Sequence, residues 1–221
     1  MCVRTDLVGV QSVLRSWGAS ERLTNAALFH SIYGTEGFQG YKLPLSHRGE
    51  IAELIGPKAE RLAWIFCMVD RYSVDMTVSS YSASDMPSGA PPPTFYARAE
   101  LGAFAMPLRS HEEWVDFLTL TLADWLEQVE GAASKAVARP VEDGVLWAKG
   151  EAWGYRRDAY ARMATILAAH GIDAAPKMHA EVYAREPEWS RALKQPKTPP
   201  MGVASLEAQE AMESAKLDFG A

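Results

Sequence analysis

Apolar side chains recur every three to four residues over most of the chain, which is the period of a helix with one buried face. Ser20 is the expected N-cap of the second helix, and Thr5 or Asp6 that of the first. The clearest pattern follows Ser110, which forms a capping box with Glu113 before a long apolar run. Helices are predicted over residues 5–18, 20–31, 46–56, 57–72, 110–130, 151–171, 176–193 and 205–216. The sequence therefore predicts an all-α fold.

The helical period is lost in the middle of the chain. Residues 73–93 are rich in Ser, Gly and Pro and predict a long loop, and the alternation that follows is too irregular for a strand. We therefore expect one helical domain over residues 1–194, with an irregular insertion at 73–109. A Pro-rich link and a short helix follow at 195–221. This tail has too few apolar residues for its own core, so it is expected to dock on the body or on a second copy, as a homodimer.

Composition and charge argue against several classes of protein and partner for this chain. The 221 residues are 48% hydrophobic and 23% charged, which suits a folded domain. A net charge of −6 argues against a nucleic-acid partner. No apolar run reaches the roughly 20 residues that span a bilayer, so no membrane partner is expected. Cys2 and Cys67 form no disulfide framework, and we expect a cytoplasmic protein.

Common short motifs for phosphate loops, dinucleotide binding, nucleophile elbows and zinc proteases are absent. What remains is a set of polar residues that the helical period places in the core. His30 ends a face of apolar residues, and Asp124 lies at the edge of a buried arc. Asp6 could face the same interior. Buried groups of this kind need a hydrogen-bond partner, a cation or a metal.

The context of these residues resembles a known family. The segment ALFHS around His30 and the segment LTLADWLE around Asp124 are similar to motifs of the HD-domain superfamily, helical metal-dependent phosphohydrolases. The nearest pattern is that of the stringent-response hydrolases of guanosine tetraphosphate. Asp6 stands where those proteins have a first histidine, and His30 with Ser31 stands where they have a His-Asp pair. The string HSIYGTE and the later RRDAY at 156–160 are similar to a small subgroup with His-Ser in that place.

The resemblance implies an HD-like helical bundle in which the helices of His30 and Asp124 lie side by side. It also implies a hydrolase or oxygenase-type enzyme that acts on a small molecule. Ser31 and Asp6 replace two of the four expected ligands, so His30, Asp124 and Asp6 would hold one divalent metal at most, as iron, manganese or zinc. A metal-free pair fits the residues equally well. Implied proton shuttles are Glu36 and His47, and the implied substrate pocket is Ser31, Tyr33, Thr35, Lys42 and Arg156.

Each of these residues also has a structural interpretation. Asp6 could be only a helix cap, and His30 a core histidine bonded to a backbone carbonyl. Asp124 could pair with Arg156, Arg157 or Tyr160. Residues Glu36, Lys42 and His47 could belong to a solvated loop. Three functions therefore stay open: a metal enzyme, a metal-free enzyme with a His-Asp acid–base pair, and a non-catalytic protein that binds a ligand or partner. We favour an enzyme, because a buried histidine and aspartate are costly to keep without a use.

Overall fold

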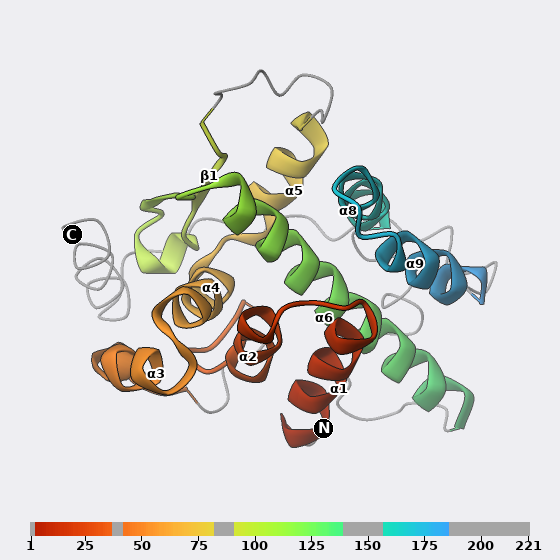
Figure 1. Cartoon of the computed structure of the whole chain (residues 1–221), viewed down its shortest axis with the longest axis horizontal. Coiled ribbons are helices and arrows are strands. Elements are labelled where there is room, and N and C mark those ends of the chain that lie inside the picture. The colour runs from red at the N-terminus through yellow and green to blue at the C-terminus, as the bar shows by residue number, and fades with distance from the viewer. Residues whose placement is uncertain (1–2, 37–41, 82–90, 139–156, 186–221) are drawn as a thin grey trace.

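A computed structural model describes residues 3–36, 42–81, 91–138 and 157–185, and the side chains at 3–6 and 129–138 lie outside that description. Over the described residues the all-α prediction is confirmed, because helices dominate and the sheet has only two short strands. Figure 1 shows one long helix crossing the molecule, with the N-terminal helices on one side and the last two described helices on the other. No described helix has the length and apolar character needed to cross a membrane.

The first two helices form a hairpin. Helix α1 (Val3–Ser16) packs against α2 (Glu21–Phe29), and Gly18 makes the turn at a φ of 74°. Ser20 is confirmed as the N-cap of α2, since its hydroxyl accepts the Leu23 amide proton at 3.3 Å. The expected cap of α1 at Thr5 or Asp6 is wrong, because the helix already begins at Val3. Both residues lie in the first turn instead, where an acidic side chain is also favourable.

The next helices build the centre of the core. A 3-10 turn, η1 (Leu45–His47), leads into α3 (Arg48–Ile55), and α4 (Pro57–Met68) follows directly. Gly56 separates α3 from α4 at a φ of 90°, with Pro57 at the start of α4 as predicted. Every residue of α4 from Ala59 to Met68 is buried, and α4 contacts α2, α3 and the long helix. A helix that is buried on all sides holds its neighbours in place.

The insertion is more regular than the sequence indicates. Helix α5 (Arg71–Ser80) occupies the beginning of the expected loop, so the loop prediction is wrong for residues 73–80. Two observations explain the helix: Asp70 accepts the Ser73 amide proton at 2.8 Å, and Val74 and Val78 bury one face. Strands β1 (Thr94–Tyr96) and β2 (Ala105–Pro107) then pair antiparallel, with Phe95 opposite Met106. A short 3-10 turn, η3 (Ala99–Leu101), lies between them.

The long helix is α6 (His111–Ala138), which ends eight residues beyond the expected boundary. It contacts α1, α2 and α4, and it also contacts α8 (Arg157–Ala169) and α9 (Ala174–Ala184). Gly9 leaves space on α1 for the Glu127 side chain of α6, because a Cβ at this position would overlap that side chain unless it shifted. The expected helix at 205–216 and the tail at 195–221 lie outside the described residues. The tail-mediated homodimer therefore stays a prediction.

Candidate functional site

His30 and Asp124 meet in the core, although 94 residues separate them in the chain. His30 is the C-cap of α2, and its side chain is 3% exposed. Its Nε2 lies 3.2 Å from Oδ1 of Asp124, which projects from the middle of α6. The sequence-based expectation that these two helices bring the two side chains together is therefore confirmed.

The other ring nitrogen of His30 fixes its orientation. Nδ1 lies 2.6 Å from the Ala27 carbonyl oxygen, and because a carbonyl can only accept, Nδ1 carries a proton and donates it. The expectation of a backbone-bonded core histidine is thus also correct. It does not exclude a functional role, because the same bond directs Nε2 toward Asp124.

Asp124 has described partners on two helices. Its side chain is 12% exposed, and Oδ1 accepts from Gln128 Nε2 at 2.8 Å in addition to facing His30. Tyr160 of α8, one of the alternative partners, instead stacks on Trp125, with ring centroids 4.8 Å apart. Arg157 forms no described bond to Asp124, and Arg156 lies outside the described residues. The helical pattern correctly predicted that Asp124 is buried, and its described partners are His30 and Gln128 rather than the alternatives on α8.

The facing atoms of the pair set its chemistry. A neutral imidazole that donates from Nδ1 presents a lone pair at Nε2, and a carboxylate oxygen presents lone pairs too. Two acceptors 3.2 Å apart in a buried place repel unless a proton or a cation lies between them. The arrangement can therefore hold either a transferable proton or a metal ion.

Phe66 of α4 packs directly against the His30 ring. The two rings meet edge to face, with centroids 5.1 Å apart, and the Arg71 guanidinium carbon lies 3.9 Å from the centroid of the same Phe66 ring. Nη1 of Arg71 is buried and has no hydrogen-bond partner within the described part of the chain. Sequence reasoning did not single out Arg71, because it lies near the end of the helix predicted over residues 57–72, whereas the structure places it at the start of α5.

Cys67 holds the backbone next to His30. Its thiol donates to the His30 carbonyl oxygen, with Sγ and O 3.1 Å apart, and the residue is completely buried. Burial raises the pKa of the Cys67 thiol to about 12. The side chain is therefore a neutral donor at ordinary pH rather than a nucleophile.

The two expected proton shuttles occupy other places. Glu36 Oε2 accepts the backbone proton of Arg71 at 3.0 Å, so this carboxylate is bound at the start of α5. His47 is 42% exposed, and its Nδ1 lies 3.0 Å from Glu50 Oε1. Among the described residues, neither side chain bonds to His30 or Asp124. The loop around them has no periodicity from which their directions could be inferred.

A second polar cluster was missed by the sequence analysis. Glu60, in the buried helix α4, accepts from Arg48 Nε at 2.6 Å, from Arg48 Nη2 at 2.7 Å and from the Tyr33 hydroxyl at 2.9 Å. The Arg48 guanidinium also lies over the Trp64 ring, 4.6 Å from its centroid. Burial and the Glu60 charge raise the pKa of Tyr33 well above its usual range. The available signal was the charged pair Glu60 and Arg61, followed by a run of apolar residues to the end of α4.

The remaining expected pocket residues are spread over the turn after α2. The Ser31 carbonyl accepts from the Gly34 amide at 3.0 Å, and Thr35 is buried. Tyr33 and Lys42 line a pocket of about 210 Å³ whose described lining does not include His30 or Asp124. The Asp6 side chain lies outside the description. Within the described residues, no cluster of three or more His, Cys, Asp or Glu side chains could hold a metal.

Comparison with known proteins gives a family likeness for part of the chain. No curated protein and no solved structure matches it. The matching segment, residues 2–71, runs from α1 through α4 and contains His30 but not Asp124. The family model that it matches is described as a domain of unknown function, DUF6817, so over these residues the chain is similar to a family to which no activity is assigned.

Proposed function

We propose that the protein is an enzyme that acts on a small molecule and uses His30 and Asp124 as an acid–base pair. The observation that supports this proposal is the 3.2 Å approach of Nε2 to Oδ1, with Nδ1 already committed to the Ala27 carbonyl. An imidazole and a carboxyl group held at this distance are components of general acid–base catalysis. The resemblance to HD-domain proteins is consistent with this proposal and is itself a prediction.

The two residues would have different roles. Asp124 is the more exposed of the pair, at 12% against 3%, so it would exchange a proton with the substrate or with water. His30 would supply or store that proton through Nε2. The hydrogen bonds from Gln128 to Asp124 and from His30 to Ala27 restrict the rotamers of both side chains. Such restriction is what positions a catalytic pair before the substrate arrives.

One divalent metal is the other form of the proposal. A histidine that donates one nitrogen to a backbone carbonyl and directs the other toward a carboxylate has the arrangement typical of metal ligands. His30 and Asp124 therefore fit as two ligands. The Asp6 side chain, the expected third ligand, lies outside the description. Such a metal would supply Lewis-acid polarisation and a more acidic water.

A non-catalytic binding protein is the alternative. Two observations favour it: His30 is almost inaccessible, and the described pocket is lined by Tyr33 and Lys42 rather than by the pair. In that case the pair would be only a structural element of the core. Measurements of metal content and turnover separate these interpretations.

Elemental analysis of the purified full-length protein tests the metal form. We expect up to one equivalent of iron, manganese or zinc per chain, lost in Asp124→Asn and retained in Asp173→Asn. Asp173 is a matched control, because it is exposed and makes no side-chain cap bond. Replacing Ser31 by Asp together with Asp6 by His should raise the occupancy. Two tightly bound metals per chain would contradict a one-metal site.

Turnover tests the enzyme itself. The full-length protein is assayed against phosphomonoesters, nucleotides that carry pyrophosphate, and carboxylic esters, with and without added metal. For a substrate that is turned over, Asp124→Asn and His30→Gln should each lower kcat by about 10²–10⁴-fold. Asp173→Asn should leave kcat unchanged. If Asp124→Asn retains full kcat, the pair is not catalytic.

A further inference from the structure

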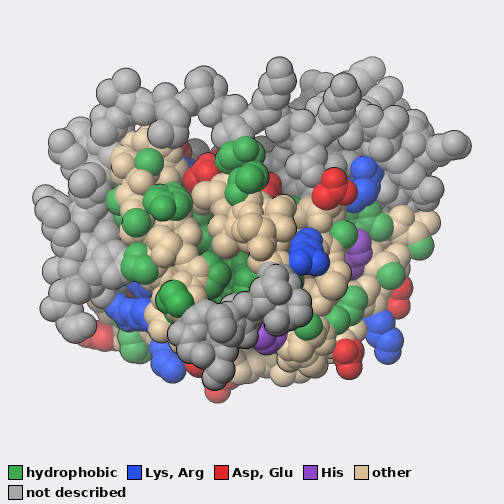
Figure 2. Space-filling view, turned by 90° about the horizontal axis from the view of Figure 1, so that it is seen from above, with side chains coloured by type: hydrophobic (Ala, Val, Ile, Leu, Met, Phe, Trp, Pro, Cys, Tyr) green, Lys and Arg blue, Asp and Glu red, His purple; other side chains and the backbone are tan. Residues whose placement is uncertain are grey.

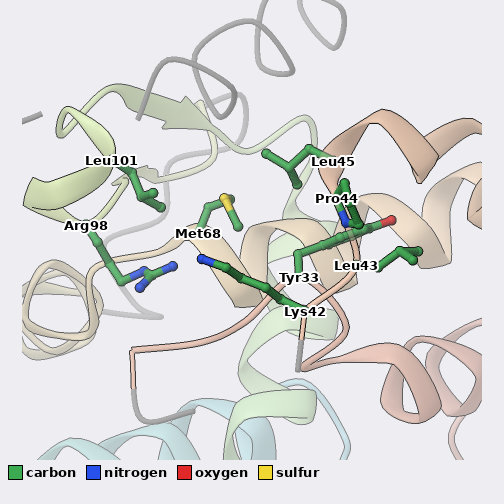
Figure 3. Close-up of a pocket in the computed structure, with 8 residues that line it drawn as sticks. All are labelled: Tyr33, Lys42, Leu43, Pro44, Leu45, Met68, Arg98 and Leu101. Atoms are coloured by element: carbon green, nitrogen blue, oxygen red, sulfur yellow. The ribbon is translucent and has the colours of Figure 1, made fainter. Parts of the chain in front are cut away.

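The pocket next to Tyr33 has a composition of its own. Its volume is about 210 Å³. It lies between the turn after α2, the segment leading into η1, the end of α4 and the turn η3. Figure 3 shows the side chains that surround it. Its described lining consists of Tyr33, Lys42, Leu43, Pro44, Leu45, Met68, Arg98 and Leu101.

Two cationic groups converge at one end of this pocket. The head groups of Arg98 and Lys42 come from different segments and point toward each other in Figure 3. Arg98 is only 4% exposed, and its Nη1 donates to Glu100 Oε1 at 2.8 Å. Its Nε is buried and has no hydrogen-bond partner within the described part of the chain. An unsatisfied donor on a buried guanidinium is costly, and a bound acceptor would remove that cost.

The rest of the lining is apolar as far as the structure describes it. Tyr33 contributes its ring, because its hydroxyl reaches away to Glu60 at 2.9 Å. The side chains of Met68, Leu45 and Leu101 surround the same space. A ligand that fits must therefore combine a charged end with an apolar part.

We propose that this pocket binds a small organic carboxylate. The carboxylate would lie between Arg98 and Lys42, and the apolar part would contact Tyr33 and Met68. An arginine fork presents parallel donors that match a carboxylate. Glu100 already neutralises part of the Arg98 charge, so a singly charged ligand fits better than a dianion. The pocket is smaller than the roughly 300–1,000 Å³ of sites for drug-sized molecules, which limits the ligand to a few carbon atoms or one ring.

This binding site is independent of the proposed catalytic pair, because its lining includes neither His30 nor Asp124. The test uses isothermal titration calorimetry on the full-length protein. The probes are butyrate and benzoate, their neutral twins butyramide and benzamide, and inorganic phosphate. We expect at least one of the two carboxylates to bind with one site per chain. Its amide twin should bind at least about tenfold more weakly, or about 1.4 kcal/mol.

Substitutions of the lining residues test whether the carboxylate binds in this pocket. Lys42→Met and Arg98→Lys should each weaken carboxylate binding about tenfold, whereas Lys58→Met should not, since Lys58 is 74% exposed on α4 and outside the pocket. Leu45→Trp leaves both cations in place and fills the cavity, so it tests the site even if an Arg98 variant fails to fold. Asp124→Asn should leave carboxylate binding unchanged.

Several outcomes would overturn the proposal. Equal binding of amide and carboxylate would make the pocket merely apolar, and binding of phosphate alone would replace the carboxylate by an inorganic anion. Absence of binding by both carboxylates, or full binding in Leu45→Trp, would refute the site. Loss of carboxylate binding in Asp124→Asn would show that the pocket and the pair are one site.

Discussion

At the scale of single residues, the core of this protein contains charge that the surrounding helices must neutralise. Glu60 and Arg48 are 5% and 12% exposed and form a bidentate ion pair, to which Tyr33 adds its hydroxyl. Removal of one partner leaves the other buried without compensation. Figure 2 shows one face of the surface, where acidic and basic side chains are interspersed.

We expect Glu60→Ala to lower the free energy of unfolding by about 3–5 kcal/mol, because Arg48 would stay buried without its carboxylate. Tyr33→Phe should cost only about 0.5–1.5 kcal/mol, the contribution of one hydrogen bond. Chemical denaturation of the two variants measures both values, with the exposed substitution Lys58→Met as control. Equal effects of Glu60→Ala and Lys58→Met would show that the ion pair does not stabilise the fold.

Cys67 gives the stability a dependence on alkaline pH. Its pKa is raised to about 12 in the folded protein, against about 8.5 in an unfolded chain, so unfolding releases a proton above pH 8.5. The stability due to the neutral thiol is fully present below pH 8.5 and decreases as the pH rises toward 12. The Tyr33 pKa is also raised, and this group contributes in the same direction above about pH 10.

The test compares Cys2→Ser with the double variant Cys2→Ser, Cys67→Ala between about pH 8.5 and 10, below the range of Tyr33. In the first protein the free energy of unfolding should decrease by up to about 1.4 kcal/mol per pH unit, and in the second the decrease should be smaller. Urea titrations at each pH give the two slopes. Parallel slopes would mean that Cys67 is ionised equally in both states.

At the scale of elements, the beginning of α6 is joined to α4 by a buried ion pair. Ser110 accepts the Glu113 amide proton at 3.1 Å, as the capping box predicts. The Glu113 carboxylate does not bond back to Ser110. It accepts from the Arg109 amide at 2.7 Å and from Arg61 Nε at 2.7 Å. Arg61 is only 3% exposed. Glu113 at the beginning of α6 therefore also neutralises a buried cation of α4.

Two substitutions at this cap should therefore differ in size. Ser110→Ala should cost about 1 kcal/mol, the usual value of an N-cap. Glu113→Ala should cost about 3–5 kcal/mol, because Arg61 would lose its partner in the core. Thermal or chemical unfolding of the two variants measures the difference. Equal losses would indicate that Glu113 acts only as a cap.

The helices could be predicted where a buried face repeats over several turns, as around Asp124 in α6. Short elements could not be predicted this way. Helix α5 has only Val74 and Val78 on its buried face, and three-residue strands such as β1 (Thr94–Tyr96) show too little alternation. The start of α1 was misplaced because Thr5 and Asp6 are compatible with both a cap and a first turn.

The candidate site was predicted in part for the same reason. Helical period places His30 and Asp124 inward, and two inward polar groups require partners. The period does not identify which partner a charged residue will find. The ion pair between Glu60 and Arg48 was therefore not predicted. Glu36 and His47 were assigned the role of proton shuttles, which their observed hydrogen bonds do not support.

At the scale of the whole molecule, the segment similar to the family of unknown function does not enclose its own core. Residues 2–71 comprise α1 to α4, whereas both Phe66 and Arg61 of α4 are covered by α6. Phe66 lies 6.2 Å from Phe117 between ring centroids, and Arg61 pairs with Glu113. Without α6, α4 would expose an apolar face and a charge that lacks its partner.

We therefore expect a fragment of residues 2–71 to lack a cooperative unfolding transition and to bind a hydrophobic dye, whereas the full chain should unfold cooperatively and bind little dye. Circular dichroism during heating and dye fluorescence are the two measurements. A sharp melting transition of the fragment would show that α1 to α4 form a stable domain on their own.

The separation of His30 and Asp124 in the chain also affects how the protein is synthesised. At about 5–20 residues per second, roughly 5–20 s pass between translation of His30 and of Asp124, 94 residues later. The hairpin of α1 and α2 can form during this interval, because its contacts are local. Helix α4 packs against α6 through Phe66 and Arg61, so its packing is completed only after α6 has been translated. We expect this interval to be the time when the nascent chain most depends on chaperones, and slow codons before α6 to lower the yield of folded protein.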